Sequence, residues 1–419
     1  MLTPHTISVV TSSWGSLDRI THPTCTTSSA TRIKPGVSAL PLTRSCAPYG
    51  KGQKKPNAKD KLPGIDCQRS TPFRGSNKTI FNIMVAGKAK KVISNATLTN
   101  CGPRDLPSRT ISFNANGSHL AIGTSSSAIH IWDPSKNEPK EVSVLSGHSA
   151  PVTRVRYHPV DLGSLLSASN NDATVRLWDA RSSPRSNSVG KIATRTRPLT
   201  VEWNPVQLHA FLVLEKNGDA KVYDKRKLSP TSKESVVPPL HSMSLDKTLP
   251  ESCLFDPTGE FLVAGASPTD GVAPLQIWNW RNEGETKIHS FPAHTGMILS
   301  MAFSHDGRTL ITGGHDAMVG IWNVESMCCT HAVSKHARYV LSTSFAPDDT
   351  MFATSTYDEC FVTDASKGTV IGAIPFSKRP RSGGAEEIAF HPVSPHVIAC
   401  AKSELKPPSA VTLVKLAIS

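Results

Sequence analysis

The chain has 419 residues, of which 38% are apolar and 19% charged, and its 46 Lys and Arg against 33 Asp and Glu give a formal net charge of +13. This balance excludes a wholly disordered chain, and the length allows one large globular body or two smaller ones. The sequence has no run of about 18 to 20 apolar residues and no apolar amino-terminal segment of signal-peptide length, so we expect a protein that is neither membrane-spanning nor secreted.

The positive charge is concentrated at the amino terminus. Residues 1–108 hold 16 Lys and Arg against 4 Asp and Glu, whereas residues 109–419 hold 30 against 29. The amino-terminal part is also rich in Ser, Thr and Pro and has no sustained period of 2 or 3.6, which is typical of disorder. We therefore predict a disordered basic extension at residues 1–85 and a folded domain at residues 86–419.

Lysine clusters in and after this extension are candidate contacts for RNA phosphates or for a nuclear-import receptor. The lysines are Lys51, Lys54, Lys55, Lys59, Lys61, Lys88, Lys90 and Lys91. The alternative is a solvated tail that keeps the protein soluble. Met84 leaves two further interpretations of residues 1–83 open: a misassigned translation start, or a targeting extension that resembles an organelle transit peptide.

From residue 109 onward one pattern recurs seven times. It consists of an alternating apolar run, a turn with Pro, Asp or Gly, a second apolar run into small residues, and a third run that in most units ends in an aromatic residue and Asp or Asn. The average of about 44 residues per unit is typical of a four-stranded propeller blade with a Trp-Asp ending. The units begin at Thr110, Val152, Leu199, Ser252, Ile298, Leu341 and Glu387.

These repeats resemble WD40 repeats, and we expect an all-β, seven-bladed WD40 β-propeller with a disordered basic amino-terminal extension. The last unit ends after its third run, which would leave its sheet with an exposed edge. The segment 91–98 is the only plausible strand upstream of the first unit. We expect it to form the missing outer strand and so to join the two ends of the ring.

Two units carry polar residues at the positions of a known structural network. In WD40 repeats a His, a Ser or Thr, an Asp and a Trp form a hydrogen-bonded chain within one blade. The resemblance assigns this role to His148, Ser167, Asp172 and Trp178 in the second unit, and to His294, Thr312, Asp316 and Trp322 in the fifth. The sixth unit keeps His336 and Asp358 but lacks the Trp, so we expect its network to be incomplete.

No catalytic motif accompanies these residues. A His and an Asp invite comparison with general-base catalysis, but neither unit adds a nucleophile or an oxyanion donor. Nucleotide-binding, hydrolase and zinc-protease motifs are missing from the sequence. Cys328-Cys329-Thr330-His331 lacks a second half that would complete a zinc site. We expect no catalytic residues, no metal, no cofactor and no small-molecule substrate.

The order of the units also resembles the THO complex subunit 3 family. The resemblance rests on Gly314–Val324, on Phe345–Asp349 with the Trp-less ending at Asp364, on Asp172–Arg181 and on Ile388–Pro392. It implies a non-catalytic scaffold in the nuclear THO/TREX assembly, which couples transcription to mRNA processing and export. The expected partners are other protein subunits of that assembly, with indirect or weak RNA contact and no membrane.

A second hypothesis rests on Trp178-Asp179-Ala180-Arg181. This Trp-Asp-x-Arg sequence is an adaptor-docking signature of substrate receptors for cullin-type ubiquitin ligases, and it also occurs in propellers without such a partner. Trp178, Asp179 and Arg181 are then the candidate docking residues. The two hypotheses predict different co-purifying proteins.

Overall fold

The computed structural model describes residues 79–82, 93–135, 138–181, 188–228, 237–245, 249–281, 287–374, 385–402 and 409–418, with the backbone alone for 79–82. All of them belong to the compact unit Phe73–Ser419. The lysines proposed above for phosphate or import contacts lie outside the described residues, and so does Met84. Of the predicted extension, residues 1–85, only 79–82 are described.

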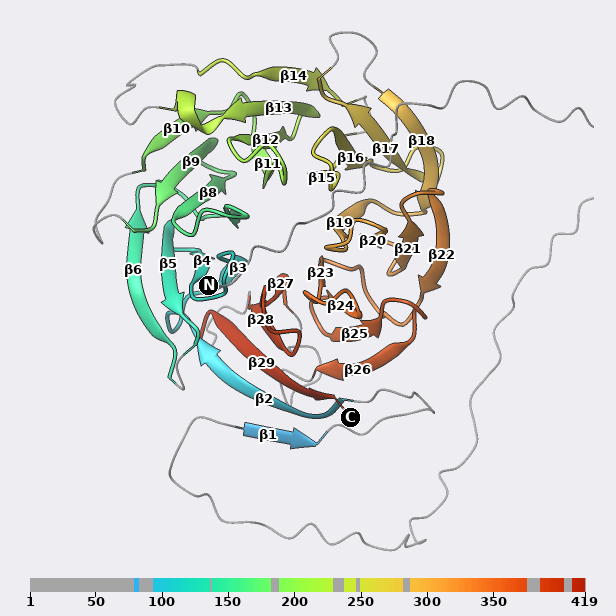
Figure 1. The fold of residues 1–419 in the computed structure, drawn as a ribbon. Helices are drawn as coiled ribbons and strands as arrows, with labels where there is room; N and C mark the ends of the chain where they lie inside the picture. The colour runs from blue at the N-terminus through green and yellow to red at the C-terminus, as the bar shows by residue number, and fades with distance from the viewer. Residues whose placement is uncertain are drawn as a thin grey trace, which may run out of the picture. The chain divides into compact units, whose positions relative to one another are not determined.

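Seven antiparallel sheets follow one another around a central axis, with one short strand of each sheet at the centre (Figure 1). This arrangement confirms the predicted all-β, seven-bladed propeller. The one helical element among the described residues is the 3₁₀ turn η1 (Lys225–Lys227).

In each of blades 1 to 4 the first strand is the innermost and the fourth is the outermost (Figure 1). Blade 1 consists of β3 (Ser108–Phe113), β4 (Leu120–Thr124), β5 (Ala128–Asp133) and β6 (Lys140–Ser146). Blade 2 consists of β7 (Arg154–Tyr157), β8 (Ser164–Ser169), β9 (Thr174–Asp179) and β10 (Gly190–Ala193). Blade 3 consists of β11 (Pro198–Trp203), β12 (Ala210–Glu215), β13 (Asp219–Asp224) and β14 (His241–Ser244). Blade 4 consists of β15 (Ser252–Phe255), β16 (Phe261–Gly265), β17 (Ala273–Asn279) and β18 (Lys287–His294).

Blades 5 to 7 also begin with their innermost strand (Figure 1). Blade 5 consists of β19 (Ile298–Phe303), β20 (Thr309–Gly314), β21 (Val319–Asn323) and β22 (Cys328–Val333). Blade 6 consists of β23 (Ser342–Phe345), β24 (Met351–Ser355), β25 (Cys360–Asp364) and β26 (Val370–Ile374). Blade 7 consists of β27 (Glu387–Phe390), β28 (Val397–Ala401), β29 (Val411–Ile418), β2 (Ile93–Cys101) and β1 (Thr79–Asn82).

The second strand of each blade is covered on both faces by neighbouring blades, which explains its composition. Every residue of β12 (AFLVLE) and of β16 (FLVAG) is buried. The outermost strands have one exposed edge and are more polar, and five of the six residues of β22 are exposed. The core therefore lies between adjacent blades, and each blade depends on its neighbours for burial.

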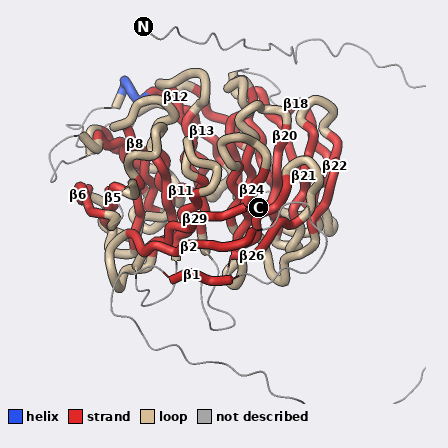
Figure 2. The backbone as a smooth tube through the Cα atoms, turned by 60° about the horizontal axis from the view of Figure 1, so that its bottom comes forward, coloured by secondary structure: helices blue, strands red, loops and turns tan. Residues whose placement is uncertain are grey.

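Blade 7 contains strands from both ends of the folded unit. β2 pairs antiparallel with β29, with Thr97 opposite Lys415 and Leu98 opposite Val414, and the two strands lie side by side in Figure 2. The segment expected at 91–98 is thus a strand that begins at Ile93 and extends to Cys101. Ile93 is fully buried in a cluster that includes Ile371 and Ile374 of blade 6.

One part of the predicted extension differs from the expectation. Thr79–Asn82 were predicted to be disordered, but they form β1, which pairs antiparallel with β2 between Thr79–Leu98 and Asn82–Asn95. The outer edge of β2 still offers unpaired backbone donors and acceptors, so a short extended segment gains hydrogen bonds there without needing an apolar core. Composition alone does not report such an edge.

The loops divide between two faces of the ring. We call the upper face the one that carries the connections between blades and the turns between the second and third strands. The lower face carries the turns between the first and second strands and between the third and fourth.

Candidate functional site

Blade 2 contains a continuous chain of four polar side chains. The Nε1–H of Trp178 donates to Ser167 Oγ at 2.8 Å, Ser167 Oγ lies 2.7 Å from His148 Nε2, and His148 Nδ1 lies 2.7 Å from Asp172 Oδ2. An indole can only donate, so the polarity of the chain follows: the hydroxyl donates to Nε2 and the Nδ1–H donates to the carboxylate. The structure brings together all four residues singled out in this unit.

Blade 5 repeats the arrangement with a threonine. Trp322 Nε1–H donates to Thr312 Oγ1 at 2.9 Å, which lies 2.7 Å from His294 Nε2. His294 Nδ1 lies 3.0 Å from Asp316 Oδ1. Asp316 also accepts the backbone N–H of Thr295 at 2.9 Å, so the network ties the loop between blades 4 and 5 to the third strand of blade 5.

Other blades have only parts of this network. In blade 6, Thr354 Oγ1 lies 3.1 Å from His336 Nε2, while Asp358 pairs with Arg338 at 2.6 Å. The Nδ1 of His336 is buried without a partner, as are the indole nitrogens of Trp132 in blade 1 and Trp278 in blade 4. The predicted incompleteness of blade 6 thus includes a missing His–Asp contact as well as a missing Trp.

The charges of the blade 2 network fit a structural role. Burial lowers the pKa of His148, with a smaller opposing effect from its bond to Asp172. Burial alone would raise the pKa of Asp172, but hydrogen bonds from Thr174 and His148 bring it below its ordinary value. A neutral imidazole beside an ionised carboxylate is a stable buried pair. Each of the four side chains in this network is hydrogen-bonded to the next one.

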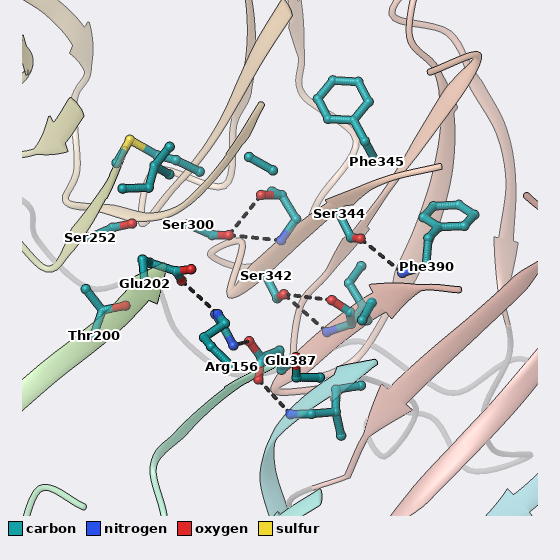
Figure 3. A pocket seen from close by; sticks show the side chains of 18 of the residues that line it. Arg156, Thr200, Glu202, Ser252, Ser300, Ser342, Ser344, Phe345, Glu387 and Phe390 are labelled. Atoms are coloured by element: carbon teal, nitrogen blue, oxygen red, sulfur yellow. Dashed lines mark hydrogen bonds and ion pairs between the residues drawn. The ribbon is translucent and has the colours of Figure 1, made fainter. Parts of the chain in front are cut away.

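The centre of the ring is a polar channel with a cavity of about 360 Å³. Arg156 of β7 crosses it, with Nε 2.7 Å from Glu202 of β11 and Nη1 2.8 Å from Glu387 of β27 (Figure 3). Burial alone would lower the pKa of Arg156, but the two carboxylates raise it above its ordinary value. The second oxygen of Glu387 accepts the backbone N–H of Ile111 at 2.8 Å. One ion-pair triad thereby connects blades 7, 1, 2 and 3.

Hydroxyl groups in the channel connect other pairs of blades. Ser300 accepts the backbone N–H of Thr343 at 2.9 Å, Ser342 that of Ile388 at 3.2 Å, and Ser344 that of Phe390 at 3.0 Å (Figure 3). These bonds use the unpaired side of the innermost strands. The channel side chains of the triad and these three serines therefore stabilise the contacts between blades.

The candidate adaptor-docking residues lie on the lower face of blade 2. Trp178 is only 1% exposed and is used by the internal network. Asp179 pairs with Arg181, whose Nε lies 2.9 Å from Asp179 Oδ1 and whose side chain is 66% exposed. Of the three residues, only Arg181 and the partly exposed side chain of Asp179 are accessible to a partner.

An apolar surface covers the lower face beside these residues. Val160 and Leu162 of blade 2 are 61% and 44% exposed, and Val206 and Leu208 of blade 3 are 60% and 37% exposed. The two turns are joined, because His158 Nε2–H donates to the backbone oxygen of Leu208 at 2.6 Å. We call these four aliphatic residues the lower apolar patch. Adjacent exposed aliphatic residues are typical of protein-binding surfaces.

The patch is built by a turn that occurs in three blades. His158 Nδ1 accepts the backbone N–H of Val160 at 3.1 Å, Asn204 Oδ1 accepts that of Val206 at 3.0 Å, and His391 Nδ1 accepts that of Val393 at 3.2 Å. Each turn holds its backbone by a local side-chain acceptor and projects valine outward, so Val393 is 66% exposed. Sequence reasoning missed these valines, although the repeated His-Pro-Val or Asn-Pro-Val marks them.

A family model for the WD domain, G-beta repeat, matches residues 139–179 and 285–323. These two spans end in Trp178-Asp179 and Trp322-Asn323, and they contain the two complete hydrogen-bonded networks. The chain is a WD40-repeat protein. Blades 1, 3, 4 and 6 have the same four-stranded architecture and blade 7 has five strands, and none of these blades shows a complete network among its described residues.

Relatives of this WD40 protein share low sequence identity with it. It is 23% identical to THO complex subunit 3 of Arabidopsis thaliana over 64% of the chain and 79% of that protein. It is 21% identical to the WD repeat-containing protein AAC3 of Dictyostelium discoideum, over 61% of the chain and 55% of that protein. It is 23% identical to protein SOF1 of Saccharomyces cerevisiae, over 64% of the chain and 52% of that protein. The chain thus spans only about half the length of the last two relatives.

Among the described residues, no three His, Cys, Asp or Glu side chains are grouped so that they could hold a metal ion. Cys328 and Cys329 lie exposed on β22, with Cys329 Sγ 3.3 Å from the backbone oxygen of His331. The same part of the chain contains no helix of the length and apolarity that a membrane crossing requires.

Proposed function

We propose that this WD40 protein is a non-catalytic scaffold subunit of a THO/TREX-type assembly that couples transcription to mRNA processing and nuclear mRNA export, and that it acts in the nucleus. The observation that carries the proposal is the extent of one alignment. The similarity to THO complex subunit 3 covers 79% of that relative, whereas AAC3 and SOF1 are matched over 55% and 52% of their lengths.

The geometry supports a scaffold that binds other proteins. The channel side chains are engaged in contacts between blades, and the paired His and Asp residues lie inside blades. The lower apolar patch, by contrast, is accessible to a partner, because its four side chains are between 37% and 61% exposed. Burying four such aliphatic residues against a partner would stabilise a complex by several kcal/mol, at about 25 cal/mol per Å² of apolar surface.

The proposal is tested by purification of the full-length tagged chain at mild salt from the cells that encode it. Mass spectrometry should find the other subunits of an mRNA-export assembly, and immunofluorescence should find the chain in the nucleus. Val160→Asp combined with Val206→Asp should release those subunits. Val272→Asp is the matched control, because Val272 is 40% exposed on the upper face of blade 4. Retention of all subunits by the double variant would contradict the role of the lower patch, and their absence from the unaltered protein would contradict the function.

The alternative is a substrate receptor of a cullin-type ubiquitin ligase. The exposed Arg181 beside the lower apolar patch is the observation that favours it. In this case the purification should recover a ligase adaptor, and Arg181→Ala should abolish its recovery while leaving mRNA-export subunits unaffected. Recovery of an adaptor that does not depend on Arg181 would argue against this docking mode.

A further inference from the structure

The described propeller residues carry a small net charge, yet their positive charges are not evenly placed. A group of cations gathers on the upper face and adjoining side of blades 2 and 3, and we call it the upper basic patch. All but Arg154, which is half-buried, are exposed. Its members are Arg154, Lys191, Arg195, Arg197 and Lys216.

Hydrogen bonds between loops hold these cations near one another. The loop Thr194–Arg197 connects blades 2 and 3, and the backbone N–H of Lys216 donates to the oxygen of Arg197 at 2.9 Å. Arg154 begins β7 and Arg197 directly precedes β11, and these neighbouring innermost strands both start at the upper face. Lys191 lies on β10, which leads into the same loop.

None of the five cations forms an ion pair within the described part of the chain. Three acids of blades 2 and 3 are engaged by other groups. Asp172 is bonded to His148 at 2.7 Å, and Glu202 is bonded to Arg156 at the same distance. The fully buried Glu215 pairs with Lys221. The positive charge of the patch is therefore not neutralised by an ion pair within the described residues.

The strand pairing adds an unfavourable contact. Lys191 lies directly opposite Arg176 in the β9–β10 register. Like charges that face each other across two strands destabilise the sheet. Arg176 and Lys191 also contribute to lowering the pKa of His148, after the larger effect of burial. An anion bound beside Lys191 would offset this unfavourable pairing.

We infer that the upper basic patch binds the phosphate backbone of single-stranded RNA without reading its sequence. This inference rests on the proposed role in mRNA export, which supplies RNA as the polyanion. Arg and Lys bind phosphate groups by charge-assisted hydrogen bonds, and each contact releases counterions from the nucleic acid. All five members of the patch are cations, so the inferred contact is with phosphate groups and does not invoke base stacking. The RNA contact thereby involves the folded blades and not only the lysine-rich extension.

The test uses the full-length protein and a fluorescein-labelled 20-mer of uridine in fluorescence anisotropy titrations. Arg195→Glu combined with Arg197→Glu should weaken binding at least tenfold near 0.1 M salt. It should also reduce the slope of log K against log salt by about 1.4, as expected for two lost contacts with a single strand. Melting temperatures measured in parallel should agree between the variant and the unaltered protein.

The matched control reverses two upper-face cations outside the patch. Arg104 and Lys335 are exposed, lie in loops between blades and have no ion pair in the described residues. Arg104→Glu combined with Lys335→Glu changes the net charge equally and should change affinity less than threefold. Equal weakening by both double variants would overturn the inference in favour of a net-charge effect, and an unchanged affinity of the Arg195/Arg197 variant would overturn it outright.

Two further outcomes separate this inference from the proposed function. An oligoglutamate peptide that binds more tightly than RNA, and depends on Arg195 and Arg197, would overturn the assignment to RNA. Purified protein that needs these arginines for RNA binding but recovers no mRNA-export subunits would leave the inference standing without the proposed assembly. Recovery of the subunits together with RNA binding that ignores the patch would refute the inference alone.

Discussion

The Nη1 atom of Arg156 lies 2.8 Å from Oε1 of Glu387, although the two residues belong to blades 2 and 7, which are separated by blade 1. Both side chains are largely shielded from solvent, and Glu202 and the backbone of Ile111 complete the group. A pair of opposite charges in such a place connects the first blades of the ring to the last. Removing one charge of this pair tests how much the channel contacts contribute to the stability of the ring.

We predict that Glu387→Ala lowers the free energy of unfolding by about 2 to 4 kcal/mol. The change leaves the N–H of Ile111 without its acceptor and Arg156 with one carboxylate in place of two, and unpaired buried groups are costly. Urea denaturation followed by tryptophan fluorescence measures the effect. Arg109→Ala is the control: Arg109 is 63% exposed and lies 3.7 Å from Glu386, so its loss should cost at most about 1 kcal/mol. Equal effects of the two variants would refute the structural role of the triad.

Much of the fold could be predicted from the sequence because the propeller repeats a local pattern. Each turn, apolar run and Trp-Asp ending is contained within about 44 residues. A motif that is weak evidence in one unit becomes strong evidence for the fold when it recurs in the others. The network residues were found for the same reason, since His148 and Trp178 occupy fixed places in one unit. The short strand β1 could not be predicted, because Thr79–Asn82 gain their pairing from the edge of β2.

The channel triad is different, because its residues come from separate units. Arg156 and Glu202 are 46 positions apart, and Glu387 follows much later in the sequence. Both carboxylates lie in the first run of their units, but a charged residue there is not part of the repeated pattern, and only closure of the ring brings the two to the same guanidinium. The upper basic patch has the same origin, since Arg154 begins β7 whereas Arg195 and Lys216 belong to two separate loops.

The blade 2 network yields a prediction with an internal control. Ser167→Ala should lower the free energy of unfolding by about 1 to 3 kcal/mol, because it leaves His148 Nε2 and Trp178 Nε1 buried without partners. Ser355 of blade 6 is equally buried, but its hydroxyl has no partner. Ser355→Ala should therefore be neutral or slightly stabilising. Equal destabilisation by both changes, in urea denaturation, would mean that the network bonds contribute nothing beyond packing.

Closure of the ring by β2 can be tested at one side chain. Ile93 is fully buried between blades 6 and 7, so Ile93→Ala should cost about 2 to 4 kcal/mol through lost burial and the cavity left behind. Asn100→Ala changes an exposed residue of the same strand and should remain within about 0.5 kcal/mol. If Ile93→Ala melts at the same temperature as Asn100→Ala, β2 does not hold the ring closed.

His336 makes the stability of blade 6 dependent on pH. Burial lowers its pKa from the ordinary value of 6.5 to about 4, and its Nδ1 has no hydrogen-bond partner. The unfolded chain therefore takes up a proton at a higher pH than the folded chain does. The stability that His336 contributes in its neutral form is fully present above pH 6.5 and is lost as the pH falls toward 4.

We predict that the free energy of unfolding of the unaltered protein falls by about 2 to 3 kcal/mol between pH 7 and pH 4 through this residue. His336→Gln cannot take up the proton, so its urea denaturation curves should lose that part of the pH dependence. His331→Gln is the control, because His331 is exposed on β22 and its replacement should leave the profile unchanged. The slope between pH 6.5 and pH 4 decides the matter: an identical slope in the His336 variant and the unaltered protein would show that the imidazole is protonated equally readily in the folded and unfolded chains. That result would be incompatible with its burial between Thr354 and the ring of Phe361, whose centroid lies 5.0 Å away.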